Sequence, residues 1–254
     1  MELFSLKGKV VLVTGGNGGV GLAYGRGLIK AGAKMAIWGR NTTKNAAAVA
    51  ELTELGGDVA AFVCDVTKAK SVDAAFSETM ARFGQIDVCF ANAGGGGPIG
   101  MLHQIEDQAW QGVLDLNLNS VVYTYRKVIA QLLERKAPGK LIVTSSVASL
   151  MGTGFAAGYA TTKAAVNGLT RALAVELGRN NIQVNAILPG YVETEMSLKT
   201  SDTFKAAAVR RNVAGKIGTL ADLEGIAVYL ASDASNFMTG QSLVLDGGHT
   251  IHPM

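Results

Sequence analysis

Short apolar, β-branched runs alternate with longer stretches of helical periodicity along this 254-residue chain. The runs predict strands and the stretches between them predict helices. Such alternation predicts a parallel sheet, because right-handed crossovers between parallel strands place helices on both faces. The strands are expected at Lys9–Thr14, Lys34–Trp38, Val59–Val63, Ile86–Phe90, Leu141–Thr144, Ile182–Leu188 and Leu243–Leu245. We therefore expect one α/β domain, 1–254, built on a doubly wound, seven-stranded parallel sheet.

The composition agrees with a sheet that is buried on both faces. Hydrophobic residues make up 48% of the chain and charged residues 17%, enough apolar surface to cover such a sheet. The helices are expected at Leu22–Lys30, Thr43–Leu55, Lys68–Phe83, Glu106–Arg135 and Tyr159–Gly178. No apolar run reaches about 18 residues, so no membrane span is predicted. A net charge of +3 is too small to favour nucleic acid or an acidic membrane as a partner.

The sequence favours neither a disulfide, nor a metal site, nor a secretion signal. Cys64 and Cys89 fall in or beside expected strands, and buried free thiols are favoured over a disulfide there. His103, His249 and His252 lack metal-ligand spacing, so no metal is expected. The first residues are too short and too interrupted by charge for a secretion signal, which makes the cytoplasm the expected location.

A glycine-rich turn follows the first expected strand. Gly16, Gly18 and Gly21 match the spacing G-x-G-x-x-G directly before the first expected helix. Glycine permits a tight strand-to-helix turn whose backbone N–H groups approach a pyrophosphate at the positive end of the helix dipole. The spacing alone is a weak signal in so glycine-rich a stretch, and a flexible turn is the alternative.

Two Tyr-x-x-x-Lys patterns occur, and one has a hydroxyl partner upstream. Tyr159 and Lys163 follow Ser146 by thirteen and seventeen residues, whereas Tyr123 and Lys127 have Trp110 at the corresponding place. Residues four apart share a helix face, and an ammonium beside a phenol is expected to lower the phenol's pKa below about 10. A hydroxyl at a strand end could then hold a carbonyl oxygen. This pattern is typical of a carbonyl–alcohol redox site, whereas Tyr123 and Lys127 are interpreted as an ordinary helix face.

Taken together, these motifs resemble the short-chain dehydrogenase/reductase family over essentially the whole chain. The matching segments are Thr14-Gly15-x-x-x-Gly19-x-Gly21, Ala91-Asn92-Ala93-Gly94, Asn117, Ser146, Tyr159-x-x-x-Lys163, Pro189-Gly190-x-Val192-x-Thr194 and Thr239–Gly248. Ala91 stands where the family more often has Asn. With Ser146, Tyr159 and Lys163 counted as one motif, six motifs in this order are specific, and they imply a Rossmann-type fold.

The resemblance implies a role for each site residue. Tyr159 would be the general acid for ketone reduction and the general base for alcohol oxidation, and Ser146 would hold the substrate oxygen. Lys163 would lower the pKa of Tyr159 and bind the nicotinamide ribose. The Asn117 carbonyl would hold a water on a proton path to Lys163. Ser145 lies one place off the spacing and should point the opposite way, because adjacent strand residues alternate.

Arg40 favours NADP(H) as the cofactor. It directly follows the second strand, and Gly39 stands where NAD-preferring relatives carry Asp. A guanidinium suits a 2′-phosphate, whereas an acidic group would repel it. NAD(H) remains the alternative, because an Arg after a strand can be merely solvated. The expected cofactor contacts are Gly15, Asn17, Gly18, Gly19, Val20, Gly21, Arg40, Asn41, Asp65, Val66, Asn92, Ala93, Gly94, Tyr159, Lys163, Pro189, Gly190, Val192 and Thr194; Asp65 reads equally well as a helix cap.

The predicted function is a reversible, NADP(H)-dependent reduction of a ketone or 3-oxo group to a secondary alcohol. An NAD-dependent alcohol or polyol dehydrogenase and a non-catalytic cofactor-binding regulator are the alternatives. Met196, Leu198, Phe204 and Phe155 suggest a partly apolar substrate pocket, although ordinary packing would use the same residues. By resemblance, the helices Glu106–Arg135 and Tyr159–Gly178 would pair between subunits of a homotetramer.

Overall fold

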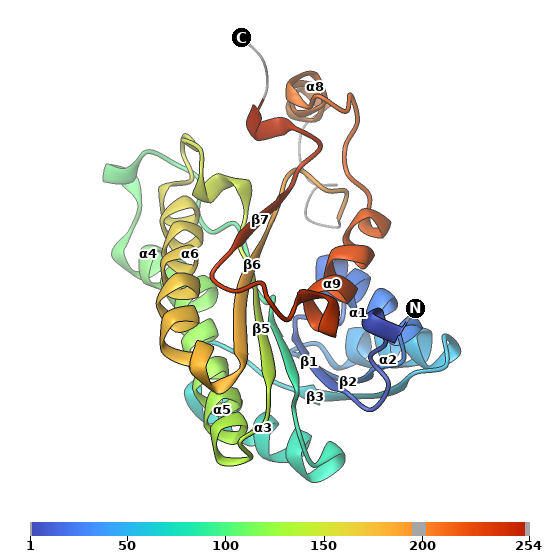
Figure 1. Cartoon of the computed structure of the whole chain (residues 1–254). Coiled ribbons are helices and arrows are strands. Elements are labelled where there is room, and N and C mark those ends of the chain that lie inside the picture. Colours follow the sequence, from blue (N-terminus) through green and yellow to red (C-terminus); the bar gives the residue numbers. More distant parts are fainter. Residues whose placement is uncertain (1, 195–201, 252–254) are drawn as a thin grey trace.

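A single seven-stranded sheet forms the centre of the molecule, for which a computed structural model describes residues 2–194 and 202–251. All neighbouring strands pair in parallel, in the order β3-β2-β1-β4-β5-β6-β7 (Figure 1). The strands are β1 (Val10–Thr14), β2 (Lys34–Gly39), β3 (Asp58–Val63), β4 (Val88–Ala91), β5 (Gly139–Thr144), β6 (Ile182–Pro189) and β7 (Ser242–Leu245). The predicted doubly wound parallel sheet is confirmed.

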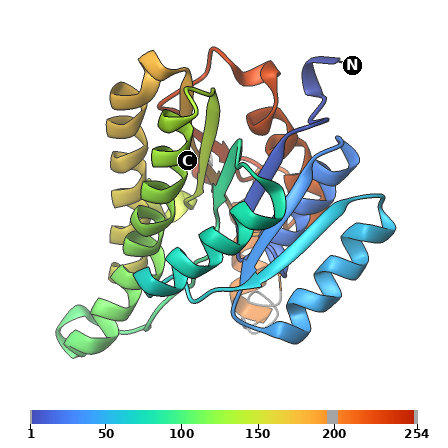
Figure 2. The ribbon, with the colours of Figure 1, turned by 90° about the horizontal axis from the view of Figure 1, so that it is seen from below.

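Helices cover both faces of the sheet. They are α1 (Gly19–Lys30), α2 (Thr42–Glu54), α3 (Ala69–Phe83), α4 (Asp107–Leu114), α5 (Ser120–Glu134), α6 (Ala157–Leu177), α8 (Asp202–Arg211) and α9 (Glu224–Ala231). Side chains of α3, α5 and α6 pack in one core cluster, and those of α1, α2 and α9 pack in another. Figures 1 and 2 show these two groups of helices on opposite sides of the sheet.

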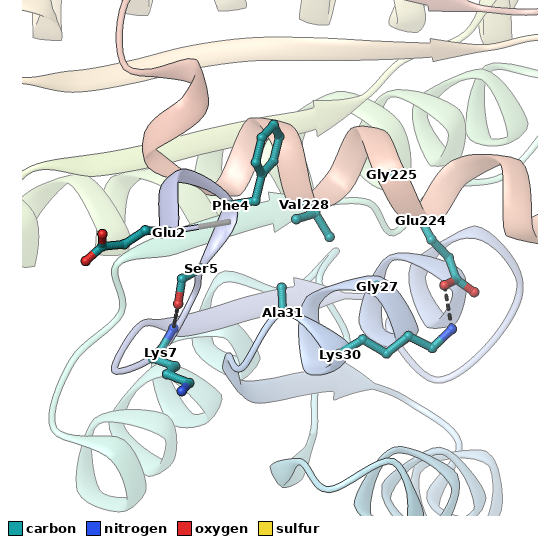
Figure 3. Close-up of a pocket in the computed structure, with 10 residues that line it drawn as sticks. All are labelled: Glu2, Phe4, Ser5, Lys7, Gly27, Lys30, Ala31, Glu224, Gly225 and Val228. Atoms are coloured by element: carbon teal, nitrogen blue, oxygen red, sulfur yellow. Dashed lines mark hydrogen bonds and ion pairs between the residues drawn. The ribbon is translucent and has the colours of Figure 1, made fainter.

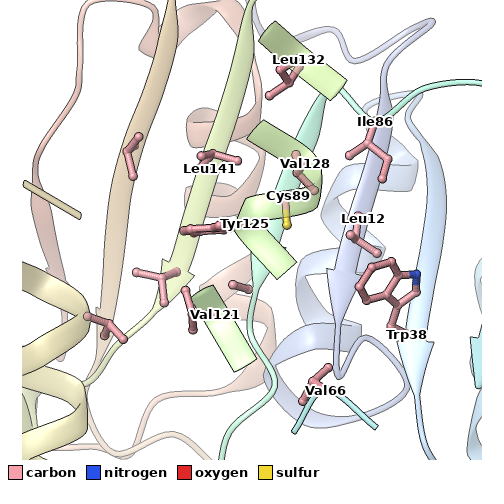
Figure 4. Close-up of a cluster of buried hydrophobic side chains, with 14 of the residues drawn as sticks. Leu12, Trp38, Val66, Ile86, Cys89, Val121, Tyr125, Val128, Leu132 and Leu141 are labelled. Carbon is pink, nitrogen blue, oxygen red and sulfur yellow. The ribbon is translucent and has the colours of Figure 1, made fainter. Parts of the chain in front are cut away.

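The pleat of β1 sends alternate side chains into the two core clusters. Leu12 packs beneath α3 and α5, whereas Val11 and Val13 pack on the α1 side, and none of the three is exposed. Figure 4 shows the first cluster, in which the fully buried Trp38 donates its indole N–H to Thr79 at 2.9 Å. Burial on both faces explains why the strands read as continuous apolar runs rather than as alternating ones.

The strand order reverses between β1 and β4, which lie side by side. The chain passes outward from β1 to β3 and then returns to place β4 on the other side of β1. Ligands of open parallel sheets bind outside the carboxyl ends of the strands at such a switch point. The ends of β1 and β4, at Thr14 and Ala91, therefore position the candidate site.

One predicted helix is interrupted. The sequence predicted a continuous helix over Glu106–Arg135, but a π-helical turn at Asp115–Asn119 separates α4 from α5. A π-turn carries an extra residue and is frequent at functional sites. Here it presents Asn117, whose side-chain amide both accepts from the Gly95 N–H and donates to the Gly95 carbonyl, each at 2.9 Å.

Cys64 and Cys89 are buried free thiols, as predicted. The described residues contain no cluster of three His, Cys, Asp or Glu side chains that could hold a metal ion. Within 2–194 and 202–251, no helix has the length and apolar character needed to cross a bilayer.

Candidate active site

The glycine turn after β1 is fixed by close backbone packing. Gly15 and Gly19 have φ values of +65° and +49°, in the left-handed region that favours glycine. A side chain at Gly21 would collide with the carbonyl oxygen of Gly15. A side chain at Gly18 would meet nothing within 4 Å, so the turn is open on that side. The turn leads into the N-terminus of the twelve-residue helix α1.

Asn92 joins the ends of three strands. Its amide nitrogen donates to the Thr14 carbonyl at 3.0 Å, and its carbonyl oxygen accepts from the Thr144 hydroxyl at 3.0 Å. The Thr14 hydroxyl in turn accepts from the backbone N–H groups of Asn92 and Ala93, both at 3.0 Å. The Asn92 side chain, predicted as a cofactor contact, therefore holds β1, β4 and β5 in register beside the turn.

Asn117 and Lys163 meet over Gly94. A Cβ added to Gly94 would lie 2.8 Å from the Asn117 amide oxygen and 3.3 Å from Lys163 Nζ. Only glycine fits between these two side chains. Lys163 Nζ donates to the Thr144 carbonyl at 2.8 Å, and the residue is 5% exposed. The predicted Asn117 and Lys163 thus come together although 45 residues of the sequence separate them.

The Ser146 side chain lies close enough to the Tyr159 hydroxyl for hydrogen bonding to act on the pKa of the phenol. Ser146 follows β5 and accepts the Ala148 N–H at 3.1 Å, which starts a short 3-10 turn. Tyr159 lies in the first turn of α6, and Lys163 lies one turn later, with Nζ 5.6 Å from the centre of the tyrosine ring. The predicted Ser146, Tyr159 and Lys163 therefore form one group.

Burial governs the proton affinities in this group. It raises the pKa of Tyr159 above its usual value, although the Ser146 hydrogen bond acts in the opposite direction. It also lowers the pKa of Lys163 to about 8. The sequence predicted that Lys163 would lower the tyrosine pKa. Within the protein the net direction is the reverse, because desolvation disfavours the phenolate and the ammonium is held on the Thr144 carbonyl.

Arg40 and its neighbours lie at the end of β2. Arg40 is exposed. Partial burial raises the pKa of Asp65, but the hydrogen bonds from Thr67 and the charge of Arg40 together outweigh it, so the net pKa is lowered. Asp65 caps the following turn by accepting from the Thr67 N–H and hydroxyl. Asn41 caps α2 through the Lys44 N–H at 2.9 Å. The Asp65 and Asn41 side chains thus have structural roles beside their predicted cofactor roles.

A partly buried amide pair occupies the space next to Gly39. Asn17 donates to the Asn45 amide oxygen at 2.7 Å, and Asn45 donates to the Gly39 carbonyl at 2.9 Å. A Cβ at Gly39 would lie 2.5 Å from the Asn45 amide oxygen and closer still to the Asn17 amide nitrogen. Asn45 was not predicted from the sequence. In the sequence Asn45 is distinguished only as a polar residue that precedes three alanines in an otherwise ordinary helix.

The segment after β6 returns to the glycine turn. Pro189 ends β6, and a Cβ on Gly190 would lie 2.7 Å from the Asp246 side chain, so glycine is required there. Val192 forms a bridge with Gly218, and Thr194 comes within 4.0 Å of a Cβ built on Gly19. Of the remaining predicted contacts, Val66 is buried in the core cluster beneath α3 and α5, and Val20 packs against the other cluster, on the α1 side. Met196, Leu198 and the Phe204 side chain lie outside the described residues.

The residues that the sequence assigned to ordinary packing are packed as expected. Ser145 is buried and donates to the Lys163 carbonyl at 3.0 Å. Tyr123 packs against the core cluster beneath α3 and α5, and Lys127 pairs with Asp73 at 2.7 Å. The second Tyr-x-x-x-Lys pattern is therefore an ordinary helix face.

Two further residues support Ser146. Asn167, on α6 one turn after Lys163, donates to the Ser149 hydroxyl at 2.8 Å. That hydroxyl donates to the Ser146 carbonyl at 2.6 Å. Asn167 could not be identified from the sequence, because its partner Ser149 lies on a different element.

A surface pocket of about 850 Å³ lies elsewhere (Figure 3). It is formed by the N-terminal residues, the end of α1 and the start of α9, and the Lys30–Glu224 ion pair of 2.8 Å closes one side. None of the predicted site residues lines it. The chemistry is therefore expected at the carboxyl edge of the sheet and not in this pocket.

Comparisons with known proteins agree with this site. The family model described as "Enoyl-(Acyl carrier protein) reductase" matches residues 15–250. The chain is 35% identical to the 3-oxoacyl-[acyl-carrier-protein] reductase FabG of Chlamydia pneumoniae, covering 97% of this chain and 98% of that one. It is 38% identical to the 5-keto-D-gluconate 5-reductase of Escherichia coli, covering 97% of each.

A solved structure matches equally well. The gluconate 5-dehydrogenase of Burkholderia cenocepacia, in complex with NADP and tartrate, superposes with a TM-score of 0.93 at 36% identity and covers 98% of each chain. The glycine turn, the grouped Ser146, Tyr159 and Lys163, and these relatives lead to one assignment. The chain belongs to the short-chain dehydrogenase/reductase family and is an NAD(P)-dependent oxidoreductase that acts on alcohol and carbonyl groups.

Proposed function

We propose that this protein reduces a ketone to a secondary alcohol with NADP(H), reversibly, at Tyr159. The observation that carries the proposal is the hydroxyl pair of Ser146 and Tyr159 with Lys163 one helical turn away. A protein that only bound a cofactor would not need an acid and a second hydroxyl positioned together. We further propose that 1–254 acts as one cofactor-binding and catalytic domain, because the site draws its members from helices and strand ends of one sheet.

The residues of the turn after β1 fit a dinucleotide. Glycines at positions 15, 19 and 21 hold the backbone tight, and Gly18 leaves open space at the start of α1. Backbone N–H groups at a helix N-terminus suit a pyrophosphate. When bound, the nicotinamide supplies or accepts the hydride. Thr194, close to Gly19, would face the same ligand from the segment after β6.

Each polar member of the site has a separate task. Tyr159 donates its proton to the carbonyl oxygen during reduction, and its raised pKa keeps it protonated through the neutral range. Ser146 holds the same oxygen and stabilises the charge that develops on it. Lys163, with a pKa of about 8, retains its charge near neutral pH and stays oriented by the Thr144 carbonyl. Asn117 fixes the loop at Gly95 through its side chain.

NADP(H) is favoured over NAD(H) by the end of β2. Arg40 is exposed beside the turn, and the Asn17–Asn45 pair fills the space that a side chain at Gly39 would need. No acidic group stands at position 39 to repel a 2′-phosphate. Charge-assisted hydrogen bonds of the kind that Arg makes with phosphate are worth roughly 1.5–3 kcal/mol.

Arg40→Leu tests the cofactor choice. We expect it to lower kcat/KM for NADPH by about 10–100-fold and to change that for NADH little, since about 1.4 kcal/mol is tenfold. Arg179→Leu is the matched control, because Arg179 is also exposed but follows α6 at the opposite edge of the sheet. A parent enzyme that prefers NADH would contradict the cofactor assignment and leave the reaction class intact.

A panel of small ketones and alcohols, followed by the absorbance of the reduced cofactor, tests the reaction itself. Turnover of ketones with NADPH supports the proposal, and turnover of alcohols or polyols with NAD⁺ alone supports the alternative dehydrogenase. Cofactor binding without turnover of any compound would support a regulator on the same fold.

We also propose a homotetramer located in the cytoplasm. Val175 on α6 and Phe237 after α9 are 86% and 107% exposed, as expected of apolar side chains that another copy covers. The free thiols of Cys64 and Cys89 agree with a reducing compartment. Sedimentation at micromolar concentration should report four copies; a fully active monomer would contradict the assembly.

A further inference from the structure

Five large apolar side chains are exposed on two loops beside the catalytic residues. Ile99, Leu102 and Phe155 are 83%, 61% and 61% exposed, and Met101 and Leu150 are more than half exposed. We call these five residues the apolar rim. Exposed apolar side chains that cluster mark a binding surface, whereas scattered ones do not.

The two loops lie side by side at the site. The Gly100 N–H donates to the Phe155 carbonyl at 2.9 Å, which ties one loop to the other. The first loop leaves Gly95, which is bonded to Asn117. The second loop connects Ser146 to Tyr159 in the chain. Figure 1 shows both loops at the end of the sheet where α6 begins. The two loops that carry the rim are thus joined directly to the segments that carry Asn117, Ser146 and Tyr159.

Phe155 is held outward at a cost in backbone energy. Its φ is +62°, a region that a bulky residue rarely adopts. Gly154, which would enter that region freely, is the preceding residue. Since an exposed phenyl ring contributes little to folding, neither the backbone conformation nor the exposure is explained by the stability of the fold.

Both loops lack formal charge. Residues 95–105 and 150–156 contain no Asp, Glu, Lys or Arg. A sugar acid would need a cationic partner and many hydrogen bonds, and these loops provide only His103, Gln104 and Thr153 as polar side chains. An alkyl chain or ring would instead be removed from water by contact with the rim.

We propose that the ketone reduced at Tyr159 carries an apolar body of several carbon atoms, which lies on the apolar rim. This inference rests on the proposed function and deepens it. Of the two substrate types named by the relatives above, it favours the acyl type over the keto-sugar acid. Ile99 and Phe155 then determine specificity without contacting the reacting atoms.

A homologous series of ethyl 3-oxoalkanoates, from four to ten acyl carbons and with NADPH, tests the proposal. Burial of each methylene should raise kcat/KM by roughly two- to fourfold until the rim is covered. 5-Keto-D-gluconate should be a poor substrate. The variants are Ile99→Ser and Phe155→Asn; Asn is chosen because it tolerates a positive φ. Each should lower kcat/KM for the longest ester about five- to twentyfold and leave the shortest within about twofold. Leu55→Ser, at an exposed apolar residue that directly follows α2, should change neither.

The outcomes separate the two proposals. A flat series, or preference for 5-keto-D-gluconate, with ethyl 3-oxobutanoate still reduced, overturns the rim assignment and leaves the proposed function standing. Failure to reduce any ketone overturns both. A change in sedimentation of Phe155→Asn with unchanged chain-length dependence would show that the rim is a contact between copies, and would also overturn the assignment.

Discussion

Gly39→Asp is the change that most directly sets packing against cofactor charge. An acidic residue at this position would offer acceptors to the ribose of NADH and repel the 2′-phosphate of NADPH. In this protein the space is occupied. The Asn17–Asn45 hydrogen bond of 2.7 Å passes beside Gly39, and Asn45 is 5% exposed. We therefore expect the substitution to change stability as well as cofactor preference.

The size of the effect follows from the contacts. A Cβ at position 39 would stand 2.5 Å from the Asn45 amide oxygen, whereas ordinary contacts begin at about 3.5 Å. The two amides must separate by about 1 Å, which breaks their hydrogen bond. A buried acceptor without a partner costs roughly 1–3 kcal/mol. For a chain of this size the loss corresponds to a fall of roughly 2–12 °C in Tm.

Thermal unfolding followed by circular dichroism measures the loss, and the ratio of kcat/KM for NADH and NADPH measures the charge effect. Gly39→Ala is the control, because it adds the methyl group without the charge and should lose nearly the same stability with a smaller change in cofactor ratio. Adding Asn17→Gly to Gly39→Asp should restore part of the Tm. A Gly39→Asp protein as stable as the parent would refute the packing argument.

Three further predictions concern the catalytic group. Tyr159→Phe should lower kcat by about 10²–10⁴-fold with cofactor binding retained, because the proton donor is lost. Tyr123→Phe, in the ordinary helix face, should leave kcat nearly unchanged, and equal losses of kcat in the two variants would contradict the assignment. Since the pKa of Tyr159 is raised, ketone reduction should hold through neutral pH and fall only in the alkaline range, while alcohol oxidation rises with pH. The Ser146→Ala variant loses the hydrogen bonding that lowers this pKa, so the alkaline fall in the variant's residual ketone reduction should move to higher pH. Alcohol oxidation that is independent of pH while chemistry is rate-limiting would argue against Tyr159 as the base. The pKa of Lys163 falls from 10.5 to about 8 in the folded protein, so burying its charge destabilises the protein at pH 7 by on the order of 3 kcal/mol. Lys163→Met should therefore be inactive yet melt at a higher temperature at pH 7, and this gain in Tm should shrink between about pH 8 and 10.5, where the folded lysine of the parent becomes neutral. A Lys163→Met protein that is less stable than the parent at pH 7 would contradict the reasoning.

The order of strands and helices, and the place of the catalytic group, were predictable from the sequence. Strand and helix periodicities are local, so the sheet and its parallel connections follow from the chain. The spacing of Tyr159 and Lys163 puts them on one helix face whatever lies around them. The alternation at a strand end likewise assigned Ser146 to the site and Ser145 to packing, and Ser145 is buried and bonded to the Lys163 carbonyl.

The interruption of the helix over Glu106–Arg135 was not predictable in the same way. The segment has helical periodicity throughout and contains no proline. The π-turn places Asn117 against Gly95, which comes from the loop after β4. That partner becomes adjacent only when β4 and α5 pack together.

The sequence by itself determined which residues are the candidates for the chemistry, because motif spacing along one helix or strand is a local property. Only the tertiary structure decided how those residues are tuned. The Tyr159 pKa is raised rather than lowered, and Gly39 has no room for a side chain. Both results depend on the exclusion of water and on contacts between elements far apart in the chain, since desolvation and packing are set by every group that surrounds a site.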